Sequence, residues 1–149
     1  MNQSNSNLTS NNAAGPRRDI VAILGIGGAG VKILSKIIAA GIEDFIKTGI
    51  VDFDNASLDS FDGPNKISSG SQWTTKGCGG DIIVGERMMA SARGKICDFA
   101  KGASCLIGVC GMGGGTGTSG AHIIARVAKG LGIPSIFVLS MPFSFEGHQ

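Results

Sequence analysis

Apolar residues in this chain fall into short runs that alternate with longer segments in which apolar positions recur at helical spacing. The runs predict strands at residues 20–24, 50–53, 66–68, 105–110 and 135–140, and the helical spacing predicts helices at residues 31–42, 83–99 and 119–129. The runs lack the period of two that marks a half-exposed strand, so we expect a parallel sheet covered on both faces. Right-handed crossovers would wind it doubly, as in a Rossmann-like α/β fold.

The start of the chain differs in composition from the rest. Residues 1–18 are rich in Asn and Ser and lack the apolar core of a secretory signal, so we expect a disordered polar leader. Residues 19–149 would then form one partial domain, in keeping with a chain that is 42% hydrophobic and 16% charged. The net charge of +2 gives no reason to expect nucleic-acid binding. No apolar stretch reaches the length needed to span a membrane.

The four cysteines stand at separations of 19, 8 and 5 residues, which fit neither a zinc pair nor a redox dithiol. We interpret them as reduced thiols of a cytoplasmic protein. Cys105 and Cys110 fall in a predicted strand that should be buried, where cysteine acts as a small hydrophobe. Cys78 falls in a glycine loop, where its thiol could react.

The segment Gly111-Met-Gly-Gly-Gly-Thr-Gly-Thr118 is the most informative part of the chain, and it lies between a predicted strand and a predicted helix. Glycine lets a backbone approach a ligand closely, and a helix start offers free N–H groups and the positive end of a dipole. The segment therefore predicts a phosphate cradle. A flexible linker is the alternative, but linkers are not usually placed between a buried strand and a helix.

A second glycine loop, Gly25-Ile-Gly-Gly-Ala-Gly30, also follows a predicted strand and precedes a predicted helix. Its Gly-x-Gly-x-x-Gly spacing is the fingerprint of dinucleotide-binding domains, which also have an acidic residue after the second strand. Asp52 and Asp54 meet that requirement. By itself this half of the chain leaves open an NAD- or FAD-binding oxidoreductase domain and other nucleotide-binding α/β folds.

With both loops considered, the chain resembles the FtsZ/tubulin family of GTP-binding, filament-forming proteins, and it is more similar to the bacterial FtsZ branch than to tubulin. The resemblance covers residues 19–149. It implies GTP or GDP and Mg²⁺ as ligands, and head-to-tail polymerisation in cell division. The matching stretches are residues 25–30, 52–58 and 75–80, and residues 111–118 together with Met141-Pro-Phe-Ser-Phe-Glu-Gly147.

The resemblance also implies roles for particular residues. Asp54 would orient a Mg²⁺-bound water, Glu146 would accept hydrogen bonds from the ribose hydroxyls, and Lys32 stands where the bacterial family usually has an asparagine in the guanine pocket. Two glycines of the third matching stretch would meet the γ-phosphate: Gly79 and Gly80. The phosphates would be cradled by the residues of the two glycine loops: Gly27, Gly28, Ala29, Gly30, Gly114, Gly115, Thr116, Gly117 and Thr118.

Several departures from the family pattern lead to further expectations. The third matching stretch looks about two residues short. Ser119 replaces the last glycine of the signature that begins at Gly111 and could cap the helix, and His122 would lie in the first helical turn. The chain ends at Gln149, so we expect it to lack the family's last strand, central helix and C-terminal domain.

Two consequences follow from that expected loss. No catalytic residue is assigned, and we expect weak GTP binding with hydrolysis at background rate. Apolar surface left bare would favour self-association or binding to a full-length FtsZ-like protein. A non-catalytic module that caps or regulates a longer polymer is the alternative to a nucleotide-binding half of a GTPase.

Overall fold

The computed structural model describes residues 20–41, 46–69 and 76–144 of the 149-residue chain. The predictions for the leader at residues 1–18 and for Glu146 concern residues outside these ranges. The described elements are β1 Val21–Ile26, α1 Gly27–Ala39, β2 Ile46–Val51, α2 Asn55–Asp59, β3 Lys66–Ile67, α3 Ile82–Ala100, β4 Cys105–Gly111, α4 Gly115–Leu131 and β5 Ser135–Ser140.

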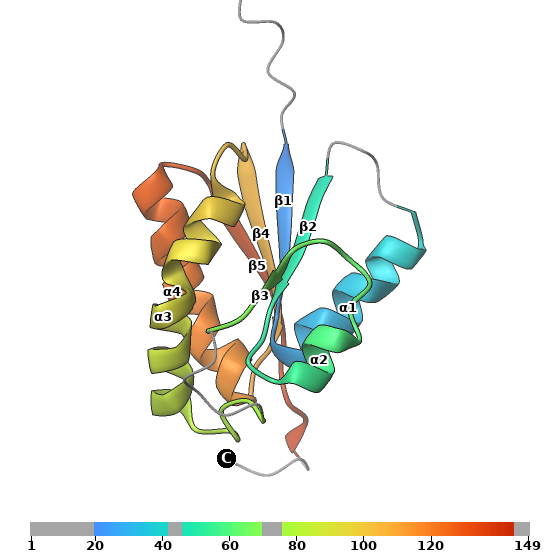
Figure 1. Ribbon diagram of the computed structural model, residues 1–149, viewed down its shortest axis with the longest axis vertical. Coiled ribbons are helices and arrows are strands. Elements are labelled where there is room, and N and C mark those ends of the chain that lie inside the picture. The colour runs from blue at the N-terminus through green and yellow to red at the C-terminus, as the bar shows by residue number, and fades with distance from the viewer. Residues whose placement is uncertain (1–19, 42–45, 70–75, 145–149) are drawn as a thin grey trace, which may run out of the picture.

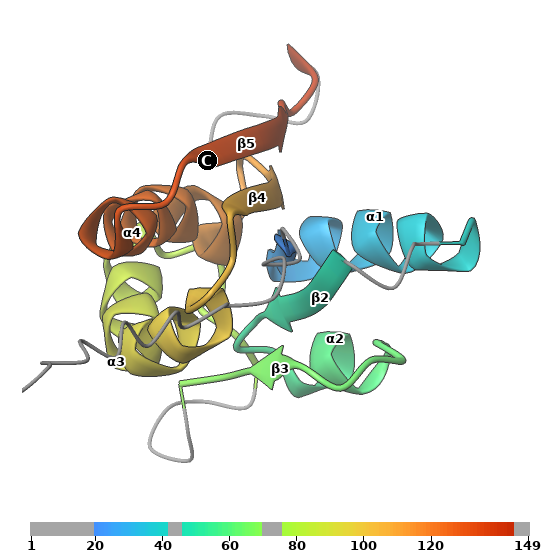
Figure 2. The ribbon, with the colours of Figure 1, turned by 90° about the horizontal axis from the view of Figure 1, so that it is seen from above.

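The strands of the described chain form one parallel sheet in the order β3-β2-β1-β4-β5. Helices α1 and α2 lie on one face of this sheet, and α3 and α4 lie on the other (Figures 1 and 2). The predicted doubly wound α/β fold is therefore confirmed. Since winding changes direction beside β1, the ends of β1 and β4 lie next to each other at the switch point where such sheets bind ligands.

The central strand β1 is buried because its side chains alternate between two cores. Ala22, Leu24 and Ile26 pack with residues of α3 and α4, whereas Ile23 packs with residues of α1 and α2. A strand with a core on each face needs apolar residues at successive positions, which is why its sequence lacks a period of two. None of the described helices is both long enough and apolar enough to cross a lipid bilayer.

β2 begins at Ile46, earlier than the predicted start at residue 50. The prediction missed the first half of this strand because Lys47 and Thr48 interrupt the apolar run. Lys47 donates a hydrogen bond from Nζ to the backbone oxygen of Phe99 at 2.8 Å, and Nζ lies 4.9 Å from the centroid of the Phe99 ring. The ammonium group is thus satisfied at the end of α3 while the aliphatic stem covers apolar surface, which allows a lysine in the strand.

Both helices that follow glycine loops begin earlier than predicted, at Gly27 instead of residue 31 and at Gly115 instead of residue 119. Glycine is a poor helix former, so local propensity does not account for these first turns. Packing does, because a Cβ atom on Gly30 would lie closer than 3.0 Å to the carbonyl oxygen of Val109, and one on Gly117 would lie as close to that of Gly111. Both first turns therefore press against the backbone of β4.

The outer strand β5 contradicts the prediction of a sheet covered on both faces. Phe137 packs against the larger core, but Ile136 and Val138 point the other way and are 57% and 56% exposed. Leu139, on the same side as Phe137, is also exposed. No described helix covers the side of β5 that carries Ile136 and Val138 (Figure 2). An uncharged apolar edge strand of this kind can pair with a strand from another chain.

We expect the purified chain to self-associate through this edge, and Val138→Lys to reduce that association, because a lysine on an edge strand disfavours strand pairing. Sedimentation velocity over a concentration series measures the effect. Ala90→Lys is the matched control, since it adds the same charge at an exposed position on α3. Wild-type chain that stays monomeric at all concentrations, or equal association of both variants, contradicts the prediction.

Candidate functional site

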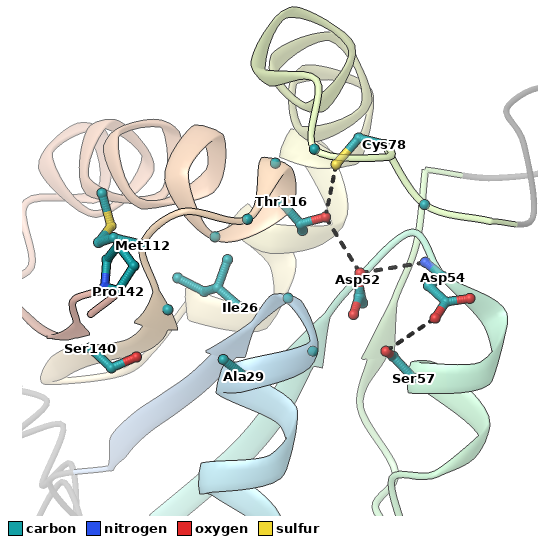
Figure 3. Close-up of a pocket in the computed structure, with 18 of the residues that line it drawn as sticks. Ile26, Ala29, Asp52, Asp54, Ser57, Cys78, Met112, Thr116, Ser140 and Pro142 are labelled. Atoms are coloured by element: carbon teal, nitrogen blue, oxygen red, sulfur yellow. Dashed lines mark hydrogen bonds between the residues drawn. The ribbon is translucent and has the colours of Figure 1, made fainter. Parts of the chain in front are cut away.

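A cleft of about 650 Å³ opens at the carboxyl ends of β1, β2, β4 and β5 (Figure 3). This volume is typical of small-molecule sites, and the position is where ligands bind in open α/β sheets. Residues from both glycine loops line the cleft, together with the loop after β2 and residues 76–80. The segment after β5 closes one side with Met141, Pro142 and Phe143.

The helices α1 and α4, which follow the two glycine loops into the cleft, differ from the other described helices in how they begin. α2 and α3 have side-chain caps, since Asp54 accepts a hydrogen bond from the backbone N–H of Ala56 and Asp81 accepts from those of Ile83 and Val84. The capping residues of α1 and α4, Ile26 and Gly114, make no side-chain cap hydrogen bond. Two helix starts without a side-chain cap therefore line one cleft, and both favour an anion there.

The two glycine loops contact each other at the bottom of the cleft. Gly27 has a φ of 68°, a conformation that favours glycine. A Cβ atom at Gly27 would lie 3.2 Å from the backbone nitrogen of Gly117 and 3.3 Å from the Cβ of Thr116. The first turn of α1 thus lies directly beside the first turn of α4, so a single anionic group can reach both helix starts.

A chain of polar contacts joins three loops around the cleft (Figure 3). The Oγ1 of Thr116 lies 3.2 Å from the Sγ of Cys78 and donates to the Oδ1 of Asp52 at 3.5 Å. Oδ1 also accepts from the backbone N–H groups of Phe53 at 2.7 Å and Asp54 at 3.4 Å. Burial raises the pKa of the Asp52 carboxyl above its ordinary value, and the hydrogen bond from Phe53 offsets part of that rise.

Asp54 lines the cleft and also caps a helix. Its Oδ1 accepts from the N–H of Ala56 at 3.3 Å and its Oδ2 accepts from the hydroxyl of Ser57 at 3.4 Å, so it caps the short helix α2. The segment at residues 76–80 is attached to this same loop, because the N–H of Gly77 donates to the carbonyl of Phe53 at 3.1 Å. The loop after β2 therefore positions the third matching stretch.

The structure brings most of the predicted site residues together and places three of them elsewhere. Gly30 lies beneath the cleft against β4, and Lys32 is exposed on α1 away from it. Thr118 does not line the cleft, but its Oγ1 accepts from the N–H of Gly113 at 3.2 Å and so shapes the loop. The predicted residues that line the cleft are Gly27, Gly28, Ala29, Asp54, Gly79, Gly80, Gly114, Gly115, Thr116 and Gly117.

Sequence reasoning missed several residues that line the cleft. Asp52 was predicted as the acidic residue of a dinucleotide fingerprint and as the first residue of the matching stretch 52–58, but it was given no part in the site, although its place directly after a buried strand was a signal for one. Ser57 and Lys76 lie in the matching stretches 52–58 and 75–80, but neither was given a part in the site. Cys78 was expected to be reactive in a loop, but it is buried against Thr116.

Other expectations also need correction. Ser119 does not cap α4; it lies inside the helix and donates from Oγ to the carbonyl of Gly115 at 2.6 Å. His122 also lies past the first turn, 3.8 Å from Glu86 of α3, and both side chains are half exposed. Cys105 is only half-buried, whereas Cys110 is buried and its burial raises the pKa of its thiol. Cys110 therefore acts as a small hydrophobe, as expected.

The described residues contain no ready-made metal centre, since no three His, Cys, Asp or Glu side chains gather among them. Mg²⁺ does not require one, because it commonly binds through one or two carboxylates, water and the phosphates of a nucleotide. Asp52 and Asp54 both line the cleft. The donor set therefore fits a magnesium ion that arrives with its phosphates rather than one bound by the protein alone.

The fold and the cleft together define a doubly wound α/β domain with an anion-binding type of site at its switch point. Comparison with known proteins identifies the family. Residues 20–149 match the GTPase domain of the Tubulin/FtsZ family, and the chain belongs to that family. The comparisons give no support to the oxidoreductase that the first glycine loop left open.

Individual relatives agree with this assignment. The cell division protein FtsZ of Mycoplasmopsis pulmonis (strain UAB CTIP) is 35% identical over 130 residues, which make up 86% of this chain and 33% of that protein. A point mutant of FtsZ from M. jannaschii has a TM-score of 0.80 at 30% identity, covering 87% of this chain and 39% of that one. An empty FtsZ dimer from M. jannaschii has a TM-score of 0.81 at 28% identity, covering 87% and 38%. The chain thus spans about a third of the length of its curated relative.

Proposed function

We propose that the cleft binds GTP or GDP, and that the chain serves as the nucleotide-binding part of an FtsZ-like cell-division GTPase. The observation that carries the proposal is the pair of helix starts without side-chain caps, α1 and α4, which meet at one cleft. Backbone N–H groups at such helix starts favour phosphate. Membership of the Tubulin/FtsZ family supports the choice of a guanine nucleotide.

In this proposal the phosphates lie between the two glycine loops. The N–H groups at the start of α1, around Gly28 and Ala29, and those at the start of α4, around Gly115 and Thr116, would donate to phosphate oxygens. The terminal phosphate would lie toward residues 76–80, where Gly79 and Gly80 are exposed and adopt positive φ values of 59° and 85°. Side chains at these two positions would be strained, so glycine keeps the backbone close to the ligand.

A magnesium ion would neutralise phosphate charge when it enters with the nucleotide. Asp54 is suited to orient a water on that ion, because its two hydrogen bonds to Ala56 and Ser57 hold its carboxylate in place. Glu146, which lies outside the described ranges, keeps its predicted part in binding the ribose. Lys32 does not line the cleft and is given no part in binding the base.

We further propose that the chain alone hydrolyses GTP at no more than background rate. Phosphoryl transfer needs a group that positions the attacking water. The carboxylates lining the described part of the cleft are Asp52 and Asp54, and both already accept hydrogen bonds from backbone N–H groups. No histidine lines this part of the cleft.

Assembly with further copies is the third part of the proposal. FtsZ from M. jannaschii has been solved as a dimer, and we propose that this chain likewise associates with itself or with a longer FtsZ-like protein. The exposed apolar residues of β5 supply surface for such contacts.

Titration with a fluorescent GTP analogue and Mg²⁺, with competition by GTP, GDP, ATP, NADH and guanosine, tests nucleotide binding. We expect GTP and GDP to compete, with guanosine much weaker because the cleft binds the ligand through its phosphates. Phosphate release, measured in parallel, is expected to stay at the buffer rate. Equal competition by guanosine contradicts the phosphate site, and competition by NADH alone restores the dinucleotide interpretation.

A further inference from the structure

The charge of the cleft does not match the ligand that its backbone favours. The charged side chains that line its described part are Asp52, Asp54 and Lys76, two negative and one positive. Lys76 is exposed to solvent, which weakens its effect. A cleft with two helix starts directed at an anion therefore also presents a net negative set of side chains to that anion.

Asp52 is the more consequential of the two carboxylates because of its burial. Its side chain is only 3% exposed, whereas Asp54 is half-buried. A buried charge is poorly screened by water and salt, so it acts strongly on other charges in the same cleft. Burial also raises the pKa of the Asp52 carboxyl, which shows that its surroundings already disfavour negative charge.

The contacts of Asp52 place it on the side of the cleft nearest residues 76–80. Its Oδ1 is linked through the hydroxyl of Thr116 to the thiol of Cys78 (Figure 3). In the proposed function that is the side of the terminal phosphate. A negative charge there opposes a triphosphate more than a diphosphate, because the extra charge of the triphosphate lies closest to it.

We propose that Asp52 sets the charge that the cleft accepts: its buried carboxylate opposes a free polyphosphate tail and makes the chain select nucleotide whose phosphates are neutralised by a divalent cation. This inference rests on the proposed nucleotide binding. A unit charge within about 8 Å of another, at an effective dielectric constant of about 20, changes affinity by more than tenfold. The effect is therefore large enough to measure.

Asp52→Asn is the direct test, because asparagine removes the charge and keeps an oxygen that can accept from Phe53 N–H and from Thr116. Affinities for GTP and GDP are measured with excess EDTA and with Mg²⁺. We expect the variant to bind GTP about tenfold more tightly than wild type in EDTA, with a smaller gain for GDP and a smaller gain in Mg²⁺. Adding Mg²⁺ should therefore raise the GTP affinity of the variant by a smaller factor than that of wild type.

Two further variants serve as controls. Asp54→Asn removes a charge that is better solvated, and asparagine is also a good helix cap, so it should gain less than Asp52→Asn. Asp62→Asn removes an exposed carboxylate that does not line the cleft and should change nothing. Equal gains in all three variants, or no gain for Asp52→Asn in EDTA, overturn the inference.

Wild-type protein alone provides a second measurement if Asp52→Asn fails to fold. In EDTA, GDP should bind wild type at least as tightly as GTP, and Mg²⁺ should improve GTP binding more than GDP binding. Tighter binding of GTP than of GDP in EDTA contradicts the inference. Absence of any nucleotide binding by wild type in both conditions refutes the proposed function instead, so the two failures are distinguishable.

Discussion

Alanine in place of Gly117 is expected to lower the free energy of unfolding by about 2–4 kcal/mol and to abolish nucleotide binding. Its Cβ would lie closer than 3.0 Å to the carbonyl oxygen of Gly111, a backbone atom that cannot rotate away. Either the first turn of α4 moves out of the cleft or the end of β4 shifts. Gly30→Ala should behave similarly, because its Cβ would meet the carbonyl oxygen of Val109.

Chemical denaturation with a fluorescence or circular dichroism signal measures this loss. Gly114→Ala is the matched control, since it adds the same methyl group in the same loop where nothing lies within 4 Å, and its φ of −93° is open to any residue. Gly28→Ala is a second control, with the Ser57 hydroxyl at an ordinary contact distance of 3.5 Å. If Gly117→Ala unfolds at the same denaturant concentration as Gly114→Ala, the close packing of Gly117 on β4 does not stabilise the fold.

Aspartate in place of Ala29 is expected to lower the affinity for nucleotide about a hundredfold while the stability of the fold is kept. Ala29 is exposed in the first turn of α1 and lines the cleft. A carboxylate at this position interacts favourably with the helix dipole, by about 0.3–1 kcal/mol, so the fold should be kept or slightly strengthened. The same charge repels phosphates bound at that helix start.

The measurement combines thermal unfolding with the nucleotide titration. Ala29→Asn is the matched control because it has nearly the same shape without the charge, so its affinity should fall far less than that of Ala29→Asp. Equal affinities of the two variants would mean that no anionic group of the ligand lies near the start of α1, and the proposed position of the phosphates would be wrong.

Local sequence patterns predicted the strands well where the chain is continuously apolar. The strand at residues 105–110 is β4 within one residue, and the strand at 135–140 is β5. Where tertiary contacts decide, the patterns failed. The first half of β2 contains the polar residues Lys47 and Thr48, and the ammonium group of Lys47 is satisfied by Phe99, a residue 52 positions away. No local pattern contains that contact.

The same limit applies to burial and to helix starts. An apolar run has the same sequence pattern whether or not a helix covers the strand. The strand β1 is covered, whereas Ile136 and Val138 of β5 are exposed. The glycines at the starts of α1 and α4 looked like loop because their propensity is low. Only the closeness of Gly30 and Gly117 to β4 accounts for the helical conformation there.

The candidate site was predictable in its glycine loops and not in the side chains between them. Glycine runs after strands mark a cradle from sequence alone. The approach of Cys78 to Thr116 depends on how residues 76–80 attach to the loop after β2, through the bond from Gly77 N–H to Phe53. The effect proposed for the Asp52 carboxylate on phosphate binding also depends on its burial, and no sequence motif predicts that burial.

The pairing of β1 with β4 also has a consequence for the order in which the molecule is made. Val21 pairs with Cys105, so 84 residues separate the two strands that support the glycine loops. Contacts between such distant parts of a chain form slowly, because a long loop must close first. During synthesis the first glycine loop therefore emerges from the ribosome long before the strand that seats Gly30 exists. The cleft can be completed only after β4 and the start of α4 have been translated, so its formation follows that of the unit made by β1 and α1.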